Sequence, residues 1–435
     1  MELRGFRTKA GRSVQLGKLS VLVGPNNVGK SRTLRDIHVR VRDGEKARTT
    51  IVETLEIVLP DDFSGLVRGL TQFDVPNNVE LVAFRGVGSD LVSGADQQVN
   101  LENVKKNFEN EDFRNSNLDW FTRQFGKFRV AHLDAASRLT IASSSAPPEP
   151  EAAPQRLIQI LLTDTVMQER LNEAFEDIFE RQVKLDYSAL SKLMLRIASE
   201  FPDIPEHPVK ARPVIQKFPL LDEQGDGFRS LTGVLLSLLA SQDRIVLIDE
   251  PEAFLHPYQA RRLGYWIGQL TKESNSQVLV ATHNANLLSG LLLSDSDVDV
   301  FRLNRTDDDT RYQRIAANHL DSLSNSPLLS NQRVLEAVFH EGAVVCEADS
   351  DKLYYQGVAD SLDLRHQIRF LHAHNKQTIH SVVQLLRAAD IPCAAIADLD
   401  LINSASDVEK LAAAFGEEDS RDLLADRAIV ATAVE

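Results

Sequence analysis

Cysteine is scarce in this sequence, which has only two among 435 residues, Cys346 and Cys393. Both lie in apolar runs typical of strands, so we expect reduced core residues rather than a disulfide. No run of about 18 apolar residues indicates a membrane span. The N-terminal "MELRGFRTKAGR" lacks the apolar core of a secretory signal. We therefore expect a cytoplasmic protein with no membrane partner.

An overall positive charge is also lacking. The formal net charge is −15, which argues against a surface covered with nucleic-acid-binding residues but leaves room for a local basic face. Residues 1–50 carry 12 Lys or Arg against 4 Asp or Glu, whereas residues 341–435 carry 8 against 17. This asymmetry favours a basic face at one end and cation-binding acids at the other. A solvated surface with chance asymmetry explains the charges equally well.

The order of apolar segments predicts an α/β fold. The chain is long enough for two or three domains, and it shows no short-period repeat. From Phe228 onward, strand-like apolar runs alternate with helix-like segments, and the alternation returns in about the last hundred residues. This pattern predicts parallel sheets in both parts. The Pro- and Ala-rich segment Ser143–Pro154 is interpreted as a disordered connector, and the terminal "AIVATAVE" as a last strand.

A phosphate-binding loop follows the first long apolar run. The sequence "GPNNVGKS" fits G-x-x-x-x-G-K-[ST] and lies between a strand-like segment and a helix start. In such a loop the glycines let backbone N–H groups surround phosphate, the lysine reaches the β- and γ-phosphates, and the hydroxyl binds Mg²⁺. The residues expected to bind ATP are Gly24, Asn26, Asn27, Gly29, Lys30 and Ser31, with Ser31 also a ligand of Mg²⁺.

Two acids that complete a nucleotide site follow much later. The strand-like "IVLIDE" ends at Asp249 and Glu250. Asp249 is suited to hold Mg²⁺ through water, and Glu250 is suited to polarise the attacking water. The alternative is that either acid is only the N-cap of a helix. This alternative explains the pair less well, because the acids follow four apolar residues in a chain that also has a phosphate loop. The pair therefore predicts ATP hydrolysis.

A second group of acids lies near the C-terminus. "AVVCE" ends at Glu347, and "AAIADLD" ends with Asp398 and Asp400. Because the carboxyl ends of parallel strands open onto one edge of a sheet, these acids should converge. Asp351 lies one helical turn beyond Glu347, so its side chain can point toward the same edge of the sheet. Converging carboxylates favour hard divalent cations, Mg²⁺ or Mn²⁺. The alternative is that the acids cap helices on a solvated rim.

The nucleotide-site motifs resemble a known group of ATPases. "DEPEAFLHP" and "ATHNANLL" are similar to segments of the ABC-type heads of the SMC/RecF and overcoming-lysogenization-defect (OLD) groups. The resemblance implies that His283 senses the γ-phosphate. It places a signature helix at "GDGFRSLTGVLLSLLA", where Gly225 and Gly227 should precede a helix that receives the γ-phosphate of a second subunit. Asp226 stands where a serine is common. A signature acting in trans implies a homodimer or higher homo-oligomer.

The C-terminal acids resemble a nuclease domain. "VVCEADSDK" and "IADLD" are similar to Toprim motifs, and "HNKQTI" resembles the segment between them in OLD proteins. The resemblance makes Glu347 a metal ligand or general acid/base, with Asp351, Asp398 and Asp400 as ligands. Ala348 replaces the usual glycine. Only Lys410 follows the D-x-D pair, where OLD proteins place a further catalytic lysine. A truncated chain, an abbreviated domain and a weakened nuclease are the alternatives that this leaves open.

An ATPase head followed by Toprim is the arrangement of OLD-family nucleases, including the larger subunit of the Gabija anti-phage system. We therefore expect an ABC-type P-loop head over residues 1–335, with a helical insertion at about 100–215. A smaller parallel-sheet Toprim-like domain should follow over residues 336–435. The leading hypothesis is an ATP-regulated, metal-dependent endonuclease that acts on double-stranded DNA in phage defence, with a defence-system partner protein. The alternatives are an ATPase scaffold or sensor with an inactive Toprim-like end that controls an effector, and an SMC/RecF-like repair ATPase.

Overall fold

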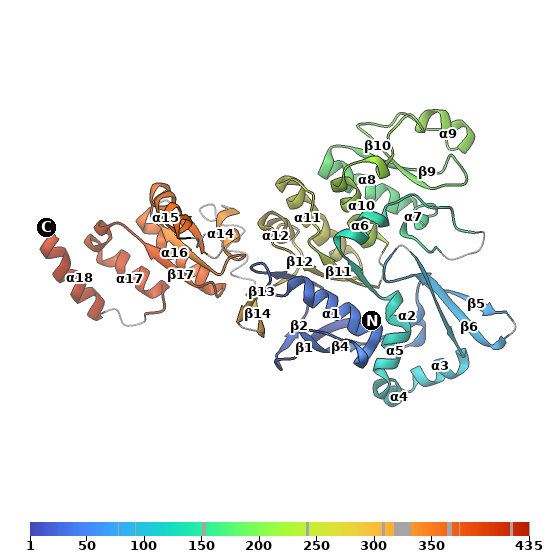
Figure 1. Ribbon diagram of the computed structural model, residues 1–435, viewed down its shortest axis with the longest axis horizontal. Coiled ribbons are helices and arrows are strands. Elements are labelled where there is room, and N and C mark those ends of the chain that lie inside the picture. Colours follow the sequence, from blue (N-terminus) through green and yellow to red (C-terminus); the bar gives the residue numbers. More distant parts are fainter. Residues whose placement is uncertain are drawn as a thin grey trace. The chain divides into compact units, whose positions relative to one another are not determined.

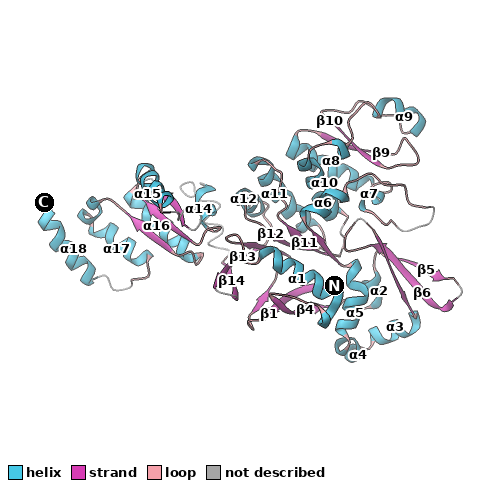
Figure 2. Cartoon of the chain, viewed as in Figure 1, coloured by secondary structure: helices cyan, strands magenta, loops and turns pink. Residues whose placement is uncertain are grey.

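The computed structural model shows an α/β protein that divides into two compact units (Figures 1 and 2). The first unit comprises Met1–Val21, Gly29–Thr282 and Asn286–Val298, and the second comprises Leu22–Val28, His283–Ala285 and Asp299–Glu435. The structure describes residues 1–76, 78–91, 93–149, 154–240, 243–306, 309–316, 332–362, 368–373, 375–417 and 421–434. Within these ranges no helix has the length and apolar character needed to span a bilayer.

The first unit contains most of the strands. They are β1 (Glu2–Thr8), β2 (Ser13–Gln15), β3 (Leu19–Val23, which continues into the second unit), β4 (Val52–Val58), β5 (Thr71–Val75), β6 (Asn78–Val87), β7 (Gly94–Val99), β8 (Val130–Leu133), β9 (Gln182–Asp186), β10 (Met194–Ala198), β11 (Ile245–Asp249) and β12 (Gln277–Ala281). Three antiparallel groups, β2-β1-β4, β5-β6-β7 and β10-β9, stand apart from a central group in which β3, β12, β11 and β8 are neighbours in that order.

The first unit also contains helices. They are α1 (Lys30–Asp43), α2 (Phe63–Val67), α3 (Leu101–Glu109), α4 (Glu111–Ser116), α5 (Leu118–Phe125), α6 (Ala135–Ile141), α7 (Leu157–Ile160), α8 (Thr165–Phe179), α9 (Pro208–Ile215), α10 (Asp226–Leu239), α11 (Pro257–Glu273) and α12 (Ala285–Leu292). In Figure 1, α1 lies on one side of β11 and β12, while α10 and α11 lie on the other. This explains why β11 has a continuous apolar sequence, since a strand covered on both faces has no solvated side.

The expected parallel pairing is confirmed in the first unit. β11 pairs in parallel with β12, with Ile245 opposite Gln277 and Asp249 opposite Ala281. It also pairs in parallel with β8, whose Leu133 lies opposite Ile248. β8 falls within the range 100–215, yet it is a strand of this central group. Because parallel strands end at a common edge, the residues that follow β8, β11 and β12 gather there.

The segment between β8 and α10 is packed rather than extended. On α8 the apolar stripe of Met167, Leu171, Ala174, Phe175 and Ile178 is buried, as its spacing predicts. Part of the predicted connector is also packed, because Ser145 forms an isolated bridge with Leu193 and is only 7% exposed. The expectation of disorder is therefore wrong at Ser145, while residues 150–153 of that connector lie outside the described residues.

The first unit contains a stacked pair of histidines. His38 of α1 and His132 of β8 have ring centroids 5.4 Å apart. Burial, followed by the neighbouring His132, lowers the pKa of His38 to about 4, from an ordinary value of 6.5. Between pH 4 and pH 6.5 the unfolded chain therefore binds more protons at His38 than the folded chain does. The contribution of His38 to the free energy of unfolding is complete above pH 6.5 and is lost as the pH falls toward 4.

We expect the melting temperature to fall as the pH is lowered from 7 to 4.5, and His38→Gln to flatten that dependence. Thermal unfolding followed by circular dichroism across this range measures it. His207→Gln, at an exposed histidine, is the matched control and should leave the slope as in the wild type. An unchanged slope in His38→Gln would show that other groups cause the acid sensitivity.

The second unit contains a hairpin and a smaller sheet. Its elements are β13 (Val298–Thr306), β14 (Asp309–Ile315), α14 (Gln332–Ala337), β15 (Gly342–Cys346), α15 (Asp349–Ser361), β16 (Ile368–His372), α16 (Lys376–Ala388), β17 (Cys393–Ile396), α17 (Ala405–Ala414) and α18 (Arg421–Val434). β13 and β14 are antiparallel, whereas β15 pairs in parallel with both β16 and β17. The parallel sheet expected here is confirmed, and both cysteines are free.

One prediction about this unit is wrong. "AIVATAVE" was expected to be a strand, but its residues up to Val434 belong to helix α18. The helix begins at Arg421, and the upstream "RDLLADRA" is rich in Leu, Ala and Arg, which are strong helix formers. The β-branched residues at the end continue a helix that those residues start.

Candidate functional site

The phosphate-loop sequence forms a tight turn before α1. Gly24 has φ +138° and Gly29 has φ +105°, both in the region that favours glycine. A Cβ atom on Gly24 would lie 2.4 Å from the carbonyl oxygen of Leu303, so only glycine fits. Gly29 is the N-cap of α1, which has no side-chain cap and no acid in its first turn. Such a helix start is suited to an anion.

The hairpin β13–β14 supports this loop within the second unit. Arg305 Nη1 donates to the carbonyl oxygen of Asn27 at 3.4 Å. Thr310 Oγ1 donates to the carbonyl oxygen of Val28 at 3.0 Å. Asn27 itself has φ +64°, and Asn26 and Asn27 are exposed. No local pattern predicts these contacts, because Arg305 and Thr310 lie 278 and 282 residues from their partners in the loop.

The predicted magnesium ligands of the nucleotide site meet. Ser31 Oγ donates to Asp249 Oδ1 at 2.8 Å, although 218 residues separate them. Burial raises the pKa of Asp249, and the hydrogen bond from Ser31 opposes that shift. Burial lowers the pKa of Lys30, and the carboxylates of Glu250 and Asp249 oppose it. A partly buried carboxylate beside a hydroxyl fits Mg²⁺, because the cation would stabilise the charged form.

The residues after β11 and β12 take specific conformations. Glu250 has φ +49°, which is uncommon for a residue other than glycine, and its N–H donates to the carbonyl oxygen of Ala281 at 2.8 Å. Glu252, which the sequence patterns did not single out, is 4% exposed and accepts a hydrogen bond from Thr282 Oγ1 at 2.6 Å. His283 follows Thr282 in the chain and is exposed.

The predicted signature segment forms helix α10. Gly225 is its N-cap, as expected. Gly227 does not precede the helix but lies in its first turn, where a Cβ atom would be 2.8 Å from the carbonyl oxygen of Phe254. Glycine is therefore required at this position by a close approach of backbones. Asp226 forms an exposed ion pair with Arg229 at 3.3 Å, which reduces the negative charge at the start of the helix.

Two of the predicted Toprim acids are adjacent. Glu347 directly follows β15, and Asp398 lies two residues beyond the end of β17. The backbone N–H of Asp398 donates to Glu347 Oε2 at 3.2 Å. Since β15 and β17 are parallel neighbours, their carboxyl ends bring these residues to one rim, as the strand pattern predicts.

The other two acids have different partners. Asp351 Oδ2 accepts a hydrogen bond from the backbone N–H of Ala348 at 3.1 Å, at the start of α15. Asp400 Oδ2 lies 2.6 Å from Lys376 Nζ, and this contact raises the pKa of Lys376. In the part of the chain that the structure describes, no group of three or more His, Cys, Asp or Glu side chains is arranged to hold a metal ion. Lys376 was not predicted as a site residue.

These acids still fit a divalent cation chemically. Carboxylate oxygens are the ligands that Mg²⁺ and Mn²⁺ prefer. Glu347 and Asp398 are already adjacent, and Asp398 and Asp400 are exposed. The lysine contact of Asp400 supplies a positive charge where the carboxylates would otherwise repel one another.

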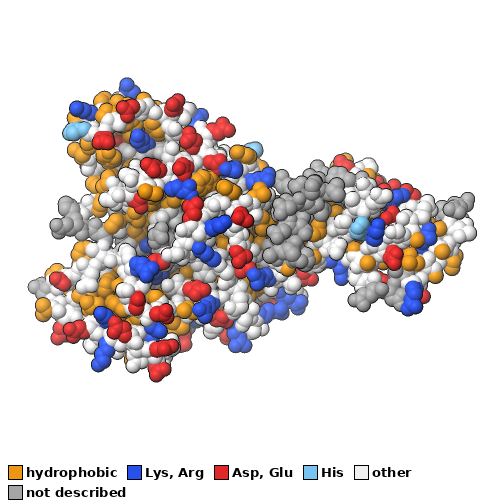
Figure 3. Space-filling view, turned by 180° about the vertical axis from the view of Figure 1, so that it is seen from behind, with side chains coloured by type: hydrophobic (Ala, Val, Ile, Leu, Met, Phe, Trp, Pro, Cys, Tyr) orange, Lys and Arg blue, Asp and Glu red, His pale blue; other side chains and the backbone are white. Residues whose placement is uncertain are grey.

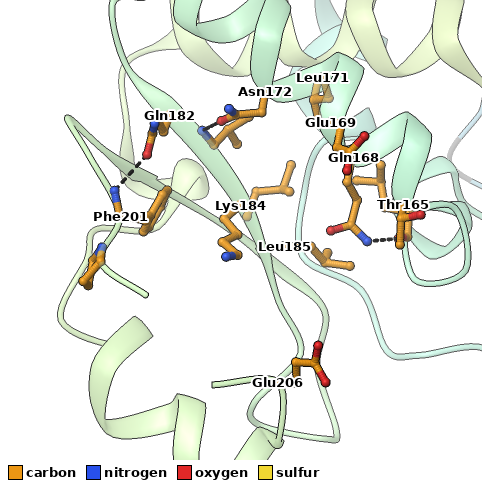
Figure 4. Close-up of a pocket in the computed structure, with 14 residues that line it drawn as sticks. Thr165, Gln168, Glu169, Leu171, Asn172, Gln182, Lys184, Leu185, Phe201 and Glu206 are labelled. Atoms are coloured by element: carbon orange, nitrogen blue, oxygen red, sulfur yellow. Dashed lines mark hydrogen bonds between the residues drawn. The ribbon is translucent and has the colours of Figure 1, made fainter. Parts of the chain in front are cut away.

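The first unit also contains a cavity that the sequence patterns did not predict. A cavity of about 610 Å³ is lined by residues of α8, β9 and β10 and by the loop at Phe201. Three amide side chains support its walls by hydrogen bonds to the backbone, Asn172 to Val183, Gln182 to Phe201 and Gln168 to Leu161 (Figure 4). None of the predicted nucleotide-site residues lines it. On the face shown in Figure 3, basic and acidic side chains are interspersed.

Comparisons with known proteins match both parts of the chain. Residues 19–289 match the family model described as "AAA domain, putative AbiEii toxin, Type IV TA system". Residues 338–400 match "Overcoming lysogenization defect protein-like, TOPRIM domain". A protein named OLD nuclease from Thermus scotoductus (strain ATCC 700910 / SA-01) is 23% identical over 92% of this chain and 81% of its own length.

Among solved structures, the chain matches heads of SMC proteins at low similarity. An SmcHead bound to the C-winged helix domain of ScpA has a TM-score of 0.41 and 13% identity, over 73% of this chain and 96% of that chain. The SMC head domain from Thermotoga maritima has a TM-score of 0.34 and 16% identity, over 73% of this chain and 100% of that chain.

Proposed function

The chain belongs to the family described as "AAA domain, putative AbiEii toxin, Type IV TA system" and carries an OLD-like Toprim domain after its ATPase domain, and from this premise we propose that it is an ATP-hydrolysing, metal-dependent endonuclease of double-stranded DNA. The relative named OLD nuclease supports the nuclease assignment. The observation that carries it is the meeting of Glu347 and Asp398 at one rim of the parallel sheet. The Toprim-like domain would extend over residues 336–435 and the ATPase head over residues 1–335.

In the ATPase reaction, bound Mg²⁺–ATP would supply the phosphoryl group and neutralise part of its charge. Lys30 would place its ammonium group against the terminal phosphates, and Gly24, Asn26, Asn27 and Gly29 would surround them with backbone. Ser31 and Asp249 would hold the cation. Glu250 would orient the attacking water and accept its proton, and His283 would contact the γ-phosphate.

In the nuclease reaction, bound Mg²⁺ or Mn²⁺ would activate water and neutralise charge at the scissile phosphate. Glu347, Asp351, Asp398 and Asp400 would hold the metal. The ligand set is not fully gathered in the described residues, so Asp400 would have to exchange Lys376 for the cation. By the resemblance to Toprim domains, Glu347, which directly follows β15, would serve either as one of these ligands or as the general acid/base.

Assembly and biological role follow from the same proposal. Gly225 and Gly227 at the start of α10 would receive the γ-phosphate of a second copy, which makes a homodimer or larger homo-oligomer the active form. Phage defence, with a partner protein from the same system, rests on the resemblance to OLD-type nucleases. Two reduced cysteines suit the cytoplasm, where such a protein would act.

The proposal predicts plasmid cleavage that depends on a divalent metal. We expect supercoiled plasmid to be nicked or linearised by the purified protein in Mg²⁺ or Mn²⁺ and to stay intact in EDTA. The extent of cleavage should change as ATP is varied. Agarose gel analysis of the products measures both effects, and plasmid with metal but no protein is the control.

One observation favours a second candidate function. Asp400 is paired with Lys376, and an acid held by lysine is not yet a metal ligand. An ATPase scaffold or sensor with an inactive Toprim-like end, controlling a partner effector, would suit this state. A protein that hydrolyses ATP, cuts no DNA in any metal and binds a second protein through its C-terminal region would establish this function instead.

A further inference from the structure

Arg138 is a fully buried arginine beside the proposed catalytic glutamate. It lies on the short helix α6, which begins directly after β8, and Asp134 caps that helix by accepting a hydrogen bond from the N–H of Ser137 at 2.8 Å. Its exposure is 0%. Burial lowers the pKa of Arg138, and Glu252 and Asp249 oppose that shift. A charge at this depth needs a full set of partners.

The guanidinium group of Arg138 has those partners. Nη2 donates to the carbonyl oxygen of Glu250 at 2.9 Å, and Nη1 donates to the carbonyl oxygen of Asp249. Nη1 also donates to the carbonyl oxygen of Leu133 at 3.3 Å, and Nε donates to Ser230 Oγ at 3.0 Å. One side chain thus joins the end of β8, the end of β11 with the residue that follows it, and helix α10.

The two carbonyl groups that Arg138 holds flank Glu250 on both sides. Glu250 is in the left-handed region, at φ +49°, where a residue with a side chain stays only if its surroundings hold it. The N–H of Glu250 is bound to Ala281, on β12. The carbonyl oxygen of Glu250 also accepts a hydrogen bond from the N–H of Ala253 at 3.0 Å. Arg138 alone binds the carbonyl groups on both sides of the Glu250 Cα atom among these contacts, and it thereby helps to fix the direction of the carboxylate.

The contact with Ser230 reaches the predicted signature helix. Ser230 is fully buried on α10, one turn beyond Gly227. The two helices approach closely here, because a Cβ atom on Gly233 would lie 2.3 Å from the carbonyl oxygen of Arg138. A displacement of α10 at this point must therefore move α6, and with it the guanidinium group that holds Glu250.

We propose that Arg138 is a positioning residue for ATP hydrolysis, which holds Glu250 in its left-handed conformation and links it to α10 through Ser230. Binding of the second copy's γ-phosphate at the start of α10 and alignment of Glu250 in this copy are then coupled. This inference rests on the proposed ATPase function. A purely structural role is the alternative, and the chain contains an example of it in Arg129, which is 3% exposed and donates to the carbonyl oxygens of Leu66 and Arg68.

The test compares Arg138→Lys with Arg129→Lys in the full chain. Lysine keeps the charge but not the planar fork, so Arg138→Lys should lower kcat for ATP roughly 100-fold, as expected when a catalytic group is displaced by about 1 Å. Its Kd for ATP should equal that of the wild type, because Lys30 and Ser31 are untouched. Arg129→Lys should lower the melting temperature and leave kcat unchanged.

Ser230→Ala tests the link to α10 and removes only one hydrogen bond. We expect kcat to fall about fivefold to tenfold, the rate equivalent of one such bond. Combined with Arg138→Lys, it should add little, because the link is already lost. Phosphate release, ATP binding by calorimetry and thermal unfolding are measured for every variant.

The outcomes separate this inference from the proposed function. Equal losses of kcat and melting temperature in Arg138→Lys and Arg129→Lys, or a loss of ATP binding in Arg138→Lys, would overturn the positioning role. So would a Ser230→Ala protein with the kcat of the wild type. A wild type that neither binds nor hydrolyses ATP would instead overturn the proposed function itself.

Discussion

Glu250→Gln is expected to retain ATP while hydrolysis falls roughly 10²- to 10⁴-fold, the range contributed by a positioned general base. The amide matches the carboxylate in shape but accepts no proton at neutral pH. Its backbone contacts with Arg138 and Ala281 remain, so the site should keep its form. ATP binding by calorimetry and phosphate release in single-turnover assays measure the two effects separately.

The companion variant Lys30→Ala should lose tight ATP binding altogether, because the chain loses the cation that its loop offers the terminal phosphates. Lys18→Ala, at an exposed lysine just before β3, is the matched control and should bind as the wild type does. The trapped Glu250→Gln protein should also show a larger mass in solution with ATP, since the signature helix must come from a second copy. Wild-type binding in Lys30→Ala would show that the loop is not the nucleotide site.

Neutralising Glu347 or Asp398 is expected to abolish DNA cleavage and to spare ATP hydrolysis. Glu347→Gln and Asp398→Asn each remove one anionic ligand from the rim, and the loss should exceed roughly 100-fold, because even outer contacts of a metal site cost 10- to 100-fold. Stability should be equal or higher without metal, since adjacent carboxylates repel one another. Plasmid nicking in Mn²⁺, the ATPase rate and the melting temperature are measured together.

Asp349→Asn provides the matched control for these variants. Asp349 is an exposed acid in the first turn of α15, close to the rim but paired with Lys352 and His372. It is not in the proposed ligand set, so its neutralisation should leave cleavage intact. Cleavage at the wild-type rate by Glu347→Gln would remove it from the metal site, and a parallel loss of ATPase activity would indicate damage to the fold.

The parts of the sites that the sequence predicts are those with local patterns. The phosphate loop is one continuous motif, and its strand and helix context is visible in the apolar residues on either side. The adjacency of Glu347 and Asp398 follows from a general property of parallel sheets, which needs only the strand ends to be located. The contact of Ser31 with Asp249 links two motifs whose joint chemistry already implies that they meet.

The remaining features depend on contacts between distant segments. Arg138 belongs to no sequence motif, and its contacts with Asp249 and Glu250 depend on the end of β8 lying beside the end of β11. Gly227 was expected before the helix, because a sequence gives no register for the close approach of Phe254. The segment "AIVATAVE" was expected to be a strand because of its β-branched residues. The residues that start helix α18 lie upstream of this segment.

The hairpin β13–β14 limits how this protein can be divided into fragments. Arg305 and Thr310 donate to carbonyl groups of the phosphate loop, while Arg302, which is 1% exposed, donates to the carbonyl oxygens of Val338 and His340. Expression of residues 1–298 alone would remove donors from the loop. Expression from residue 336 onward would remove Arg302, which binds the carbonyl oxygens of Val338 and His340. The two activities are therefore better separated by point substitutions in the intact chain than by cutting it.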